Sequence, residues 1–210
     1  KLSKAKMLCR LGAMLRNNIR MRLLYFLLFQ REIEVWSADQ NPKWFNSVGS
    51  DKTFGVRGSK KIVVIENHAL TRAGFTAMTL CTSRNAGVPP KLAILFKAAT
   101  GEKVIPRLIA PENTLVQTGP KGSYRTEQVL TWVQWCLPKA ETPQDSKLLY
   151  LDYFAAHKEP RVETLVNEHL NHTLMFHGPG TTEKAQVNDT HLHKGYNQKF
   201  SQLECERQEI

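Results

Sequence analysis

Residues 147–158 read KLLYLDYFAAHK, and this stretch decides the fold. The apolar run at 148–151 is long enough for a strand and too short for a helix. An unbroken run of this kind suits a strand that is buried on both faces of a sheet. Asp152 follows it directly, where the catalytic group of an open α/β sheet usually stands. The alternative is that Asp152 only caps the next helix, since aspartate is a favoured cap and turn residue.

The segments around this strand predict a mixed α/β order. Short apolar runs bounded by Gly, Pro or Asn indicate strands, and apolar residues at 3.6-residue spacing indicate helices. We predict strands at 33–36, 61–66, 75–82, 92–96 and 173–176, and helices at 1–30, 126–137, 160–169 and 187–204. Asn41-Pro42 should break the first strand, and residues 99–123 should form a long, weakly patterned connection. Adjacent strands followed by αβ units predict a ribonuclease H-like mixed sheet with helices on both faces.

The positive charge is concentrated at the start of the chain. Residues 1–31 hold eight Lys or Arg and no acid, whereas the remainder has 21 basic against 19 acidic residues. We therefore expect a basic helical arm, or the tail of an upstream domain, at 1–31 and one domain at 32–210. A basic arm on a near-neutral domain suits a polyanionic partner, of which nucleic acid is the commonest. A mitochondrial transit peptide and a solvated helix face are the alternatives.

Several classes of protein are disfavoured by the sequence. The four cysteines are far apart and show no CxxC pair, which argues against a disulfide framework or a thiolate zinc site. The longest apolar run has seven residues, at 23–29, whereas a membrane span needs about 20. Gly178-Pro179-Gly180 lacks the lysine-bearing spacing of a phosphate-binding loop. We expect no membrane association and no nucleotide site.

Three aspartates stand where predicted elements end or begin. Asp39 ends the first strand, Asp152 ends the central strand, and Asp189 stands at the start of the last helix. The 36 residues between the second and third can hold one helix and one short strand, so the chain can return to the same edge of the sheet. Converging carboxylates suit Mg²⁺ or Mn²⁺. Two such ions can promote an in-line displacement at phosphorus.

Histidines offer a rival metal site through HxxH and HxH spacings, although neutral histidine on a polar helix is more often a surface residue. They are His169, His172, His177, His191 and His193.

Other polar residues near the aspartates suggest supporting roles. His193 lies four residues after Asp189 and is expected to orient or shield that carboxylate. His157 follows Asp152 by five residues and is expected to meet a phosphate or a water. Candidate phosphate contacts, each with a solvated surface lysine as the alternative, are Lys158, Lys184 and Lys194.

Five segments occur in the order of a known family. They are SADQNP with KTFGVRGSKK at 37–42 and 52–61, PPKLAILFKA at 89–98, GSYRTEQVLTWVQ at 122–134, LLYLDYFAAHK at 148–158 and TTEKAQVND at 181–189. Over about residues 33–203, the chain resembles the catalytic domain of DDE-type transposases. The similarity is to the pogo, Tigger, jerky and centromere-protein-B-like branch of the mariner superfamily.

The resemblance implies that Asp39, Asp152 and Asp189 form the metal-binding catalytic triad, with Asp in the third position instead of Glu. It implies cleavage of DNA strands with Mg²⁺ or Mn²⁺, two ions in all, and joining of a 3′-hydroxyl to target DNA. The implied setting is the nucleus, with a homodimer on transposon ends. One alternative is a domesticated, non-catalytic DNA-binding or chromatin interaction domain, and another is a standalone ribonuclease H-like nuclease.

The chain also departs from the family pattern. TRAGFT at 71–76 replaces a segment that often carries two basic residues, and QVND at 186–189 has Val and Asn where Pro and Leu are frequent. The helix-turn-helix domains that precede the family's catalytic domain are missing, unless residues 1–31 are their tail. Recognition of transposon ends would then lie outside this chain.

Overall fold

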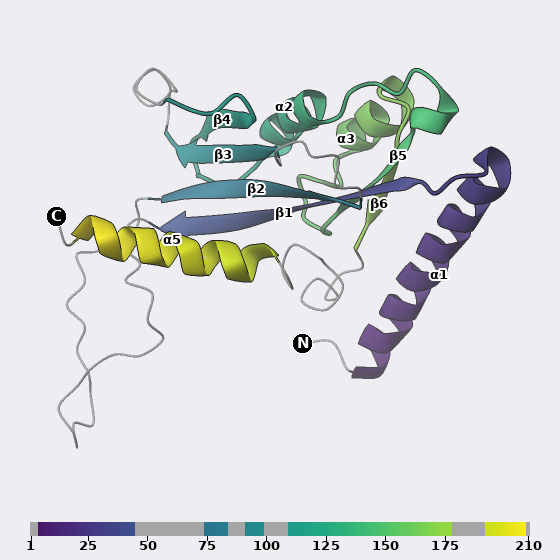
Figure 1. Ribbon diagram of the computed structural model, residues 1–210, viewed down its shortest axis with the longest axis horizontal. Coiled ribbons are helices and arrows are strands. Elements are labelled where there is room, and N and C mark those ends of the chain that lie inside the picture. Colours follow the sequence, from purple (N-terminus) through teal and green to yellow (C-terminus); the bar gives the residue numbers. More distant parts are fainter. Residues whose placement is uncertain (1–3, 45–73, 84–90, 99–108, 178–191, 209–210) are drawn as a thin grey trace.

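The chain folds around one mixed six-stranded sheet, with strand order β4-β3-β2-β1-β5-β6 (Figure 1). This computed structural model describes residues 4–44, 74–83, 91–98, 109–177 and 192–208. The strands are β1 (Glu34–Trp44), β2 (Gly74–Thr82), β3 (Leu92–Lys97), β4 (Thr114–Gly119), β5 (Lys147–Leu151) and β6 (Thr173–Phe176). The helices are α1 (Lys4–Phe29), α2 (Thr126–Cys136), α3 (Pro160–Thr164) with its π-helical continuation (Leu165–His169), and α5 (His193–Gln208), besides a 3₁₀ turn (Pro143–Asp145).

The pairing of the strands confirms the predicted fold class. β1 pairs antiparallel with β2 and parallel with β5, β2 pairs antiparallel with β3, and β3 with β4 and β5 with β6 are parallel pairs. Both parallel and antiparallel neighbours therefore occur in one sheet, which is consistent with a ribonuclease H-like α/β fold. The predicted strand at 148–151 lies between β1 and β6, and its buried residues explain its unbroken apolar run.

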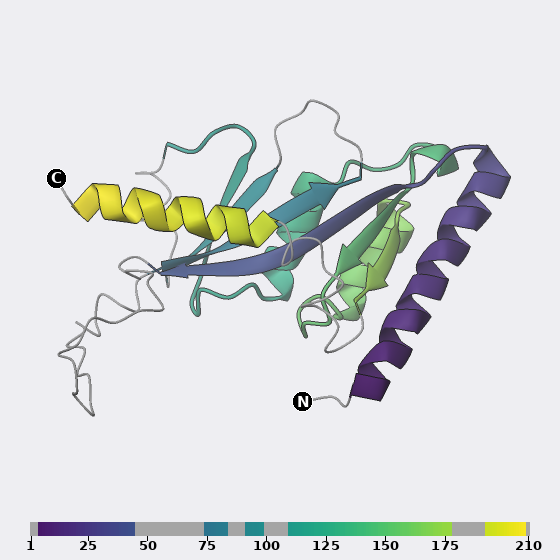
Figure 2. The same ribbon diagram turned by 60° about the horizontal axis from the view of Figure 1, so that its bottom comes forward.

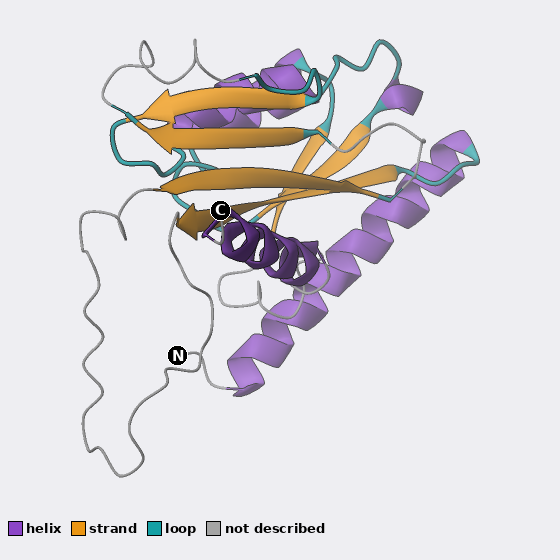
Figure 3. Cartoon of the chain, turned by 60° about the vertical axis from the view of Figure 1, so that its left-hand side comes forward, coloured by secondary structure: helices purple, strands orange, loops and turns teal. Residues whose placement is uncertain are grey.

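The two faces of the sheet bury different helices. On one face, Trp132 and Val133 of α2 pack in a core cluster with Trp36, Leu95 and Leu149. Their spacing along α2 places the buried residues on one side of that helix. The other face is covered by α1 near β5 and by α5 along β1, as Figure 2 and Figure 3 show. Helices thus lie on both faces, as predicted.

α1 contacts the sheet through only one of its sides. Tyr25 is buried with Leu148 and Tyr150 of β5, and Phe29 packs against this cluster. Other large apolar residues of α1 remain exposed, among them Leu15 and Leu27. No helix in the described ranges is long and apolar enough to cross a membrane.

Two details of the predicted element order are wrong. β1 does not break at Asn41-Pro42 but continues to Trp44, so Asp39 lies within the strand and does not end it. β5 pairs with β1 only as far as Ser37, so among the described strands β2 alone pairs with β1 at Pro42. Proline is tolerated on such an edge. The connection predicted at 99–123 contains β4, whose mixed TLVQTG sequence has a weak strand pattern. β4 forms because it pairs in parallel with β3 along six residues.

Other expectations lie outside the described residues. These are the strand at 61–66, the first part of the helix at 187–204, and Asp189 itself. The described part of the last helix begins as α5 at His193.

Candidate functional site

Asp39 and Asp152 lie at matching levels of two neighbouring parallel strands. Ser37 of β1 is in register with Tyr150 of β5, and each aspartate follows two residues later along its own chain. Neighbouring strands are about 4.8 Å apart. The register therefore places two of the three predicted site residues at the same level of neighbouring chain segments, where β5 ends. The third, Asp189, lies outside the described residues.

Asp152 is held by the turn that follows it. The Phe154 backbone N–H donates to Asp152 Oδ1 at 3.3 Å, and His157 Nδ1 contacts the same oxygen. His157 is fully buried, and its Nε2 lies 3.1 Å from Gln40 Nε2. Because the Gln40 amide nitrogen can only donate, His157 Nε2 accepts and its Nδ1–H donates to Asp152. This chain of contacts leaves the Asp152 side chain 25% exposed and fixed in direction.

The His157 contact differs from the role that the sequence suggested. We expected His157 to meet a phosphate or a water, but its two ring nitrogens are engaged by protein groups. It acts instead as a buried support between Gln40, the neighbour of Asp39, and Asp152. Supports of this type orient a ligating carboxylate and tune its basicity.

Asp39 is covered by the first turn of α5. His193 Nδ1 lies 3.4 Å from Asp39 Oδ2, and His193 Nε2 lies 2.9 Å from the Thr79 hydroxyl. Thr79 is the registered partner of Asp39 on β2 and also donates to the Asp39 carbonyl at 3.3 Å. The Asp39 side chain is 8% exposed as a result. His193, expected to orient or shield Asp189, shields Asp39 in the described structure.

The rest of α5 is docked on the same face of β1 by polar contacts. Asn197 accepts hydrogen bonds from Lys43 Nζ and from Asn41 Nδ2, the latter at 3.0 Å. Lys43 Nζ also donates to Asn41 Oδ1 at 2.9 Å and lies 5.3 Å from the ring centroid of Tyr196. Burial lowers the pKa of Lys43 to about 8 because the ammonium loses water. Phe200 completes the row with an edge contact to Phe75 at 5.7 Å.

The contacts between α5 and β1 join one side of the helix to one face of the strand. His193, Asn197 and Phe200 are separated by four and three residues, so they lie on one side of α5. Asp39, Asn41 and Lys43 alternate along β1 and share one face of it. α5 therefore runs beside the part of β1 that extends past β5 (Figure 2). His193, in the first turn of α5, contacts Asp39.

The donor set fits a hard cation only in part. Asp39 and Asp152 supply the carboxylate oxygens that Mg²⁺ and Mn²⁺ prefer. Each uses one oxygen in a contact with an imidazole nitrogen. Within the ranges that the structure describes, no three or more His, Cys, Asp or Glu side chains are grouped so that they could hold an ion. Asp189 would have to complete the site.

The remaining histidines do not assemble among the described residues. His169 is exposed at the end of the π-helical turn. His172 is buried, with Nδ1 accepting from the Lys147 N–H at 3.1 Å and Nε2 donating to the Pro138 carbonyl at 2.7 Å. Burial lowers the pKa of His172. His177 stacks on Tyr150 with ring centroids 5.1 Å apart, and His191 lies outside the described residues.

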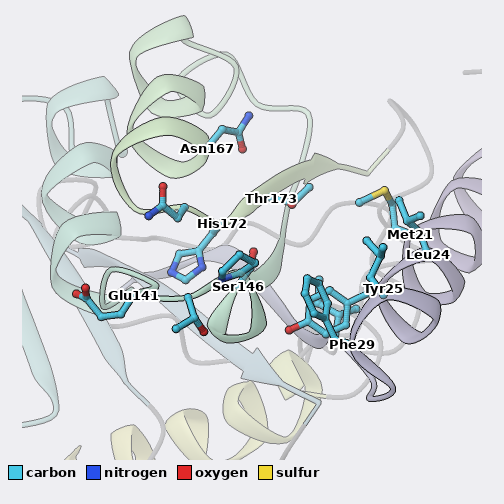
Figure 4. A pocket seen from close by; sticks show the side chains of 14 residues that line it. Met21, Leu24, Tyr25, Phe29, Glu141, Ser146, Asn167, His172 and Thr173 are labelled. Atoms are coloured by element: carbon cyan, nitrogen blue, oxygen red, sulfur yellow. The ribbon is translucent and has the colours of Figure 1, made fainter.

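A cavity of about 550 Å³ lies away from the aspartates, between α1 and the amino ends of β5 and β6 (Figure 4). Tyr25 and Phe29 form its apolar wall, and Ser146 and Thr173 mark the amino ends of β5 and β6. Asp39 and Asp152 are not among its lining residues. His172, which lines it, already uses both nitrogens to join three segments of backbone.

Sequence reasoning missed the residues that support the two aspartates. Gln40 carries a signal only in its position beside Asp39. Thr79 could be identified only from the register of β1 and β2, which no local pattern specifies. Of the lysines expected at the site, Lys158 lies 4.1 Å from the ring centroid of Tyr153. Lys194 is in the first turn of α5, and Lys184 is outside the described residues.

Comparisons of the chain with models of protein families, with curated proteins and with solved structures found no match. The arguments for function therefore rest on the residues and on their arrangement.

Proposed function

We propose that this chain is the catalytic core of a metal-dependent DNA endonuclease and strand transferase of the DDE transposase type. The observation that carries the proposal is the placement of Asp39 and Asp152 at matching levels of β1 and β5. Asp152 directly follows β5, where open α/β sheets usually place their reactive groups, and Asp39 lies within β1. The five ordered segments of sequence provide the resemblance on which the reaction type depends.

The position of α5 supports a role for Asp189. Asp189 precedes His193 by four residues, and His193 lies 3.4 Å from Asp39. Four residues of chain span at most about 14 Å, so the chain between His193 and Asp189 allows the two aspartates to lie close together. The three carboxylates would then hold the ions between them.

The chain's own residues would divide the work as follows. Asp39 and Asp152 bind Mg²⁺ or Mn²⁺, and His157 keeps Asp152 in one orientation through its Nδ1–H. Bound ions of this kind activate the attacking oxygen and stabilise the leaving oxygen at a phosphodiester. Lys158, six residues after Asp152, would contact a neighbouring phosphate. DNA in the nucleus is the proposed substrate, and a homodimer on transposon ends is the proposed assembly.

Nicking of supercoiled plasmid DNA in Mn²⁺ tests this proposal. We expect the native chain to convert the plasmid to the nicked form, and Asp152→Asn to abolish the conversion. Glu163→Gln, an exposed carboxylate of α3, is the matched control and should nick like the native chain. Equal inactivity of the native chain and Asp152→Asn, with Mn²⁺ bound and the fold intact, would overturn the proposal.

The burial of Asp39 favours one second candidate, a domesticated domain that binds DNA or chromatin without cleaving it. The Asp39 side chain is 8% exposed beneath His193, so an ion at Asp39 must displace or share the contact with His193. In such a domain, DNA binding would persist in EDTA and no nicking would follow when Mn²⁺ is added. The plasmid assay, run beside a binding assay, separates the two candidates.

A further inference from the structure

Two aromatic side chains are exposed directly beside Asp152. Tyr153 is 47% exposed and Phe154 is 40% exposed. They are adjacent in sequence and begin the turn after β5. Tyr124 and Trp132, by contrast, are buried. An exposed aromatic pair next to a candidate reactive carboxylate indicates a contact with a ligand.

Both rings pack against neighbours and remain partly exposed. Tyr153 packs edge-on against Phe176 of β6, with ring centroids 6.1 Å apart and planes at 89°. Phe154 packs edge-on against His157 at 5.7 Å and 73°. His157 in turn contacts Asp152. The rings therefore have a defined position relative to the carboxylate, and their ordering has already been achieved before a ligand arrives.

A lysine accompanies the rings. Lys158 Nζ lies 4.1 Å from the Tyr153 ring centroid, and among the described residues no carboxylate forms an ion pair with it. Exposed aromatic rings beside a cation suit single-stranded nucleic acid, in which bases stack on the rings and phosphates meet the charge. A paired base inside a duplex offers no free face for such stacking.

We infer that Tyr153 and Phe154 form a stacking platform for an unpaired nucleobase of DNA, with Lys158 on the adjoining phosphate. The platform would hold a frayed or extruded nucleotide next to the phosphodiester at Asp152. This inference rests on the proposed function for its place in a reaction. Binding of single strands, however, needs no metal and no cleavage, so it is measured separately.

The experiment is a fluorescence titration in EDTA with a single-stranded oligonucleotide that contains 2-aminopurine, beside the duplex of the same sequence. We expect the native chain to quench the single strand and to prefer it to the duplex. Tyr153→Ala and Phe154→Ala should each weaken binding about tenfold, within the range measured for loss of one base–aromatic stack. Tyr153→Trp should restore it. Lys158→Ala should lower the slope of log K against log salt by about 0.7.

Ile109→Ala is the control, because Ile109 is a fully exposed apolar residue outside the basic arm and outside the turn after β5. It should bind like the native chain. Melting temperatures should stay close to native, and Phe154→Leu retains an apolar side chain if Phe154→Ala does not fold. The inference is overturned if the alanine variants bind the single strand as tightly as the native chain, or if Ile109→Ala weakens binding equally.

The parallel plasmid assay in Mn²⁺ separates the two proposals. If the native chain nicks DNA while the Tyr153 and Phe154 variants bind single strands normally, the platform is wrong and the endonuclease stands. If single-strand binding depends on both rings but no nicking occurs, the platform stands and the endonuclease is wrong.

Discussion

Ser37 of β1 lies in register with Tyr150 of β5, two residues before Asp39 and Asp152 respectively. This relationship places two carboxylates side by side on strands that are 113 residues apart at these positions. The residues that contact these two aspartates can be tested one at a time.

Removing the buried support of Asp152 should destabilise the domain. His157→Ala leaves a cavity and takes a partner from both Gln40 and Asp152. We expect a loss of about 3 kcal/mol in the free energy of unfolding, measured with urea. His169→Ala, at an exposed position, should change it by less than about 0.5 kcal/mol. Equal effects of the two substitutions would contradict a supporting role for His157.

Removing the cover of Asp39 should ease the entry of metal. His193→Ala deletes the imidazole that lies 3.4 Å from the carboxylate. A hydrogen bond to a charged group contributes about 1.5 kcal/mol, so the Mn²⁺ concentration for half-saturation should fall roughly tenfold. Gln198→Ala is the control, since Gln198 is exposed on α5 next to the docking residue Asn197. Weaker Mn²⁺ binding by His193→Ala would mean that His193 supports the site rather than covers it.

The buried ammonium of Lys43 should produce a pH dependence above neutrality. Its pKa in the folded protein is about 8, against about 10.4 in an unfolded chain. The unfolded state binds more protons between these values, so stability rises with pH across that window. The slope approaches about 1.4 kcal/mol per pH unit. Lys43→Met should lack it, and identical urea-unfolding profiles of variant and native protein from pH 8 to 10 would refute the burial of this charge.

His172 should make the stability of the folded protein fall at low pH. Burial lowers its pKa, and its two hydrogen bonds require the neutral ring with the proton on Nε2. Below the unfolded pKa of about 6.5, the unfolded state binds more protons, so stability falls as pH falls. His172→Gln should flatten this decrease in melting temperature between pH 7 and 5. A variant that loses as much stability as the native chain over that range would place the effect elsewhere.

The fold was largely predictable because the sequence encodes it locally. The apolar run of β5 and the 3.6-residue spacing of Val129, Trp132 and Val133 reflect burial that the structure confirms. β4 was not predictable, because its sequence alternates weakly and its formation depends on a distant parallel partner. The extension of β1 through Pro42 was not predicted, because the sequence does not show where β5 ends. Proline is tolerated at residue 42 because β5 pairs with β1 only as far as Ser37.

The two aspartates of the candidate site could be predicted from the sequence, but the side chains that contact them could not. Asp39 and Asp152 stand out because each follows apolar strand residues. The pairing of His193 with Asp39 depends on where α5 docks, and no pattern around residue 193 specifies a partner on β1. Gln40 and Thr79 gain their roles only when β1, β2 and β5 are assembled. Local sequence therefore singled out the two aspartates, whereas tertiary structure determines which side chains contact them.

The measurement that tests the central claim most directly is the binding of Mn²⁺, followed by electron paramagnetic resonance, to the native chain and to single Asp→Asn variants. If the three aspartates share a metal site, the native chain should bind Mn²⁺ saturably. This binding should be strongly weakened in Asp39→Asn, Asp152→Asn and Asp189→Asn alike. Glu163→Gln should bind as the native chain does. Saturable Mn²⁺ binding that is unchanged in Asp39→Asn and Asp152→Asn, or no saturable binding by the native chain, would contradict a metal site shared by these aspartates.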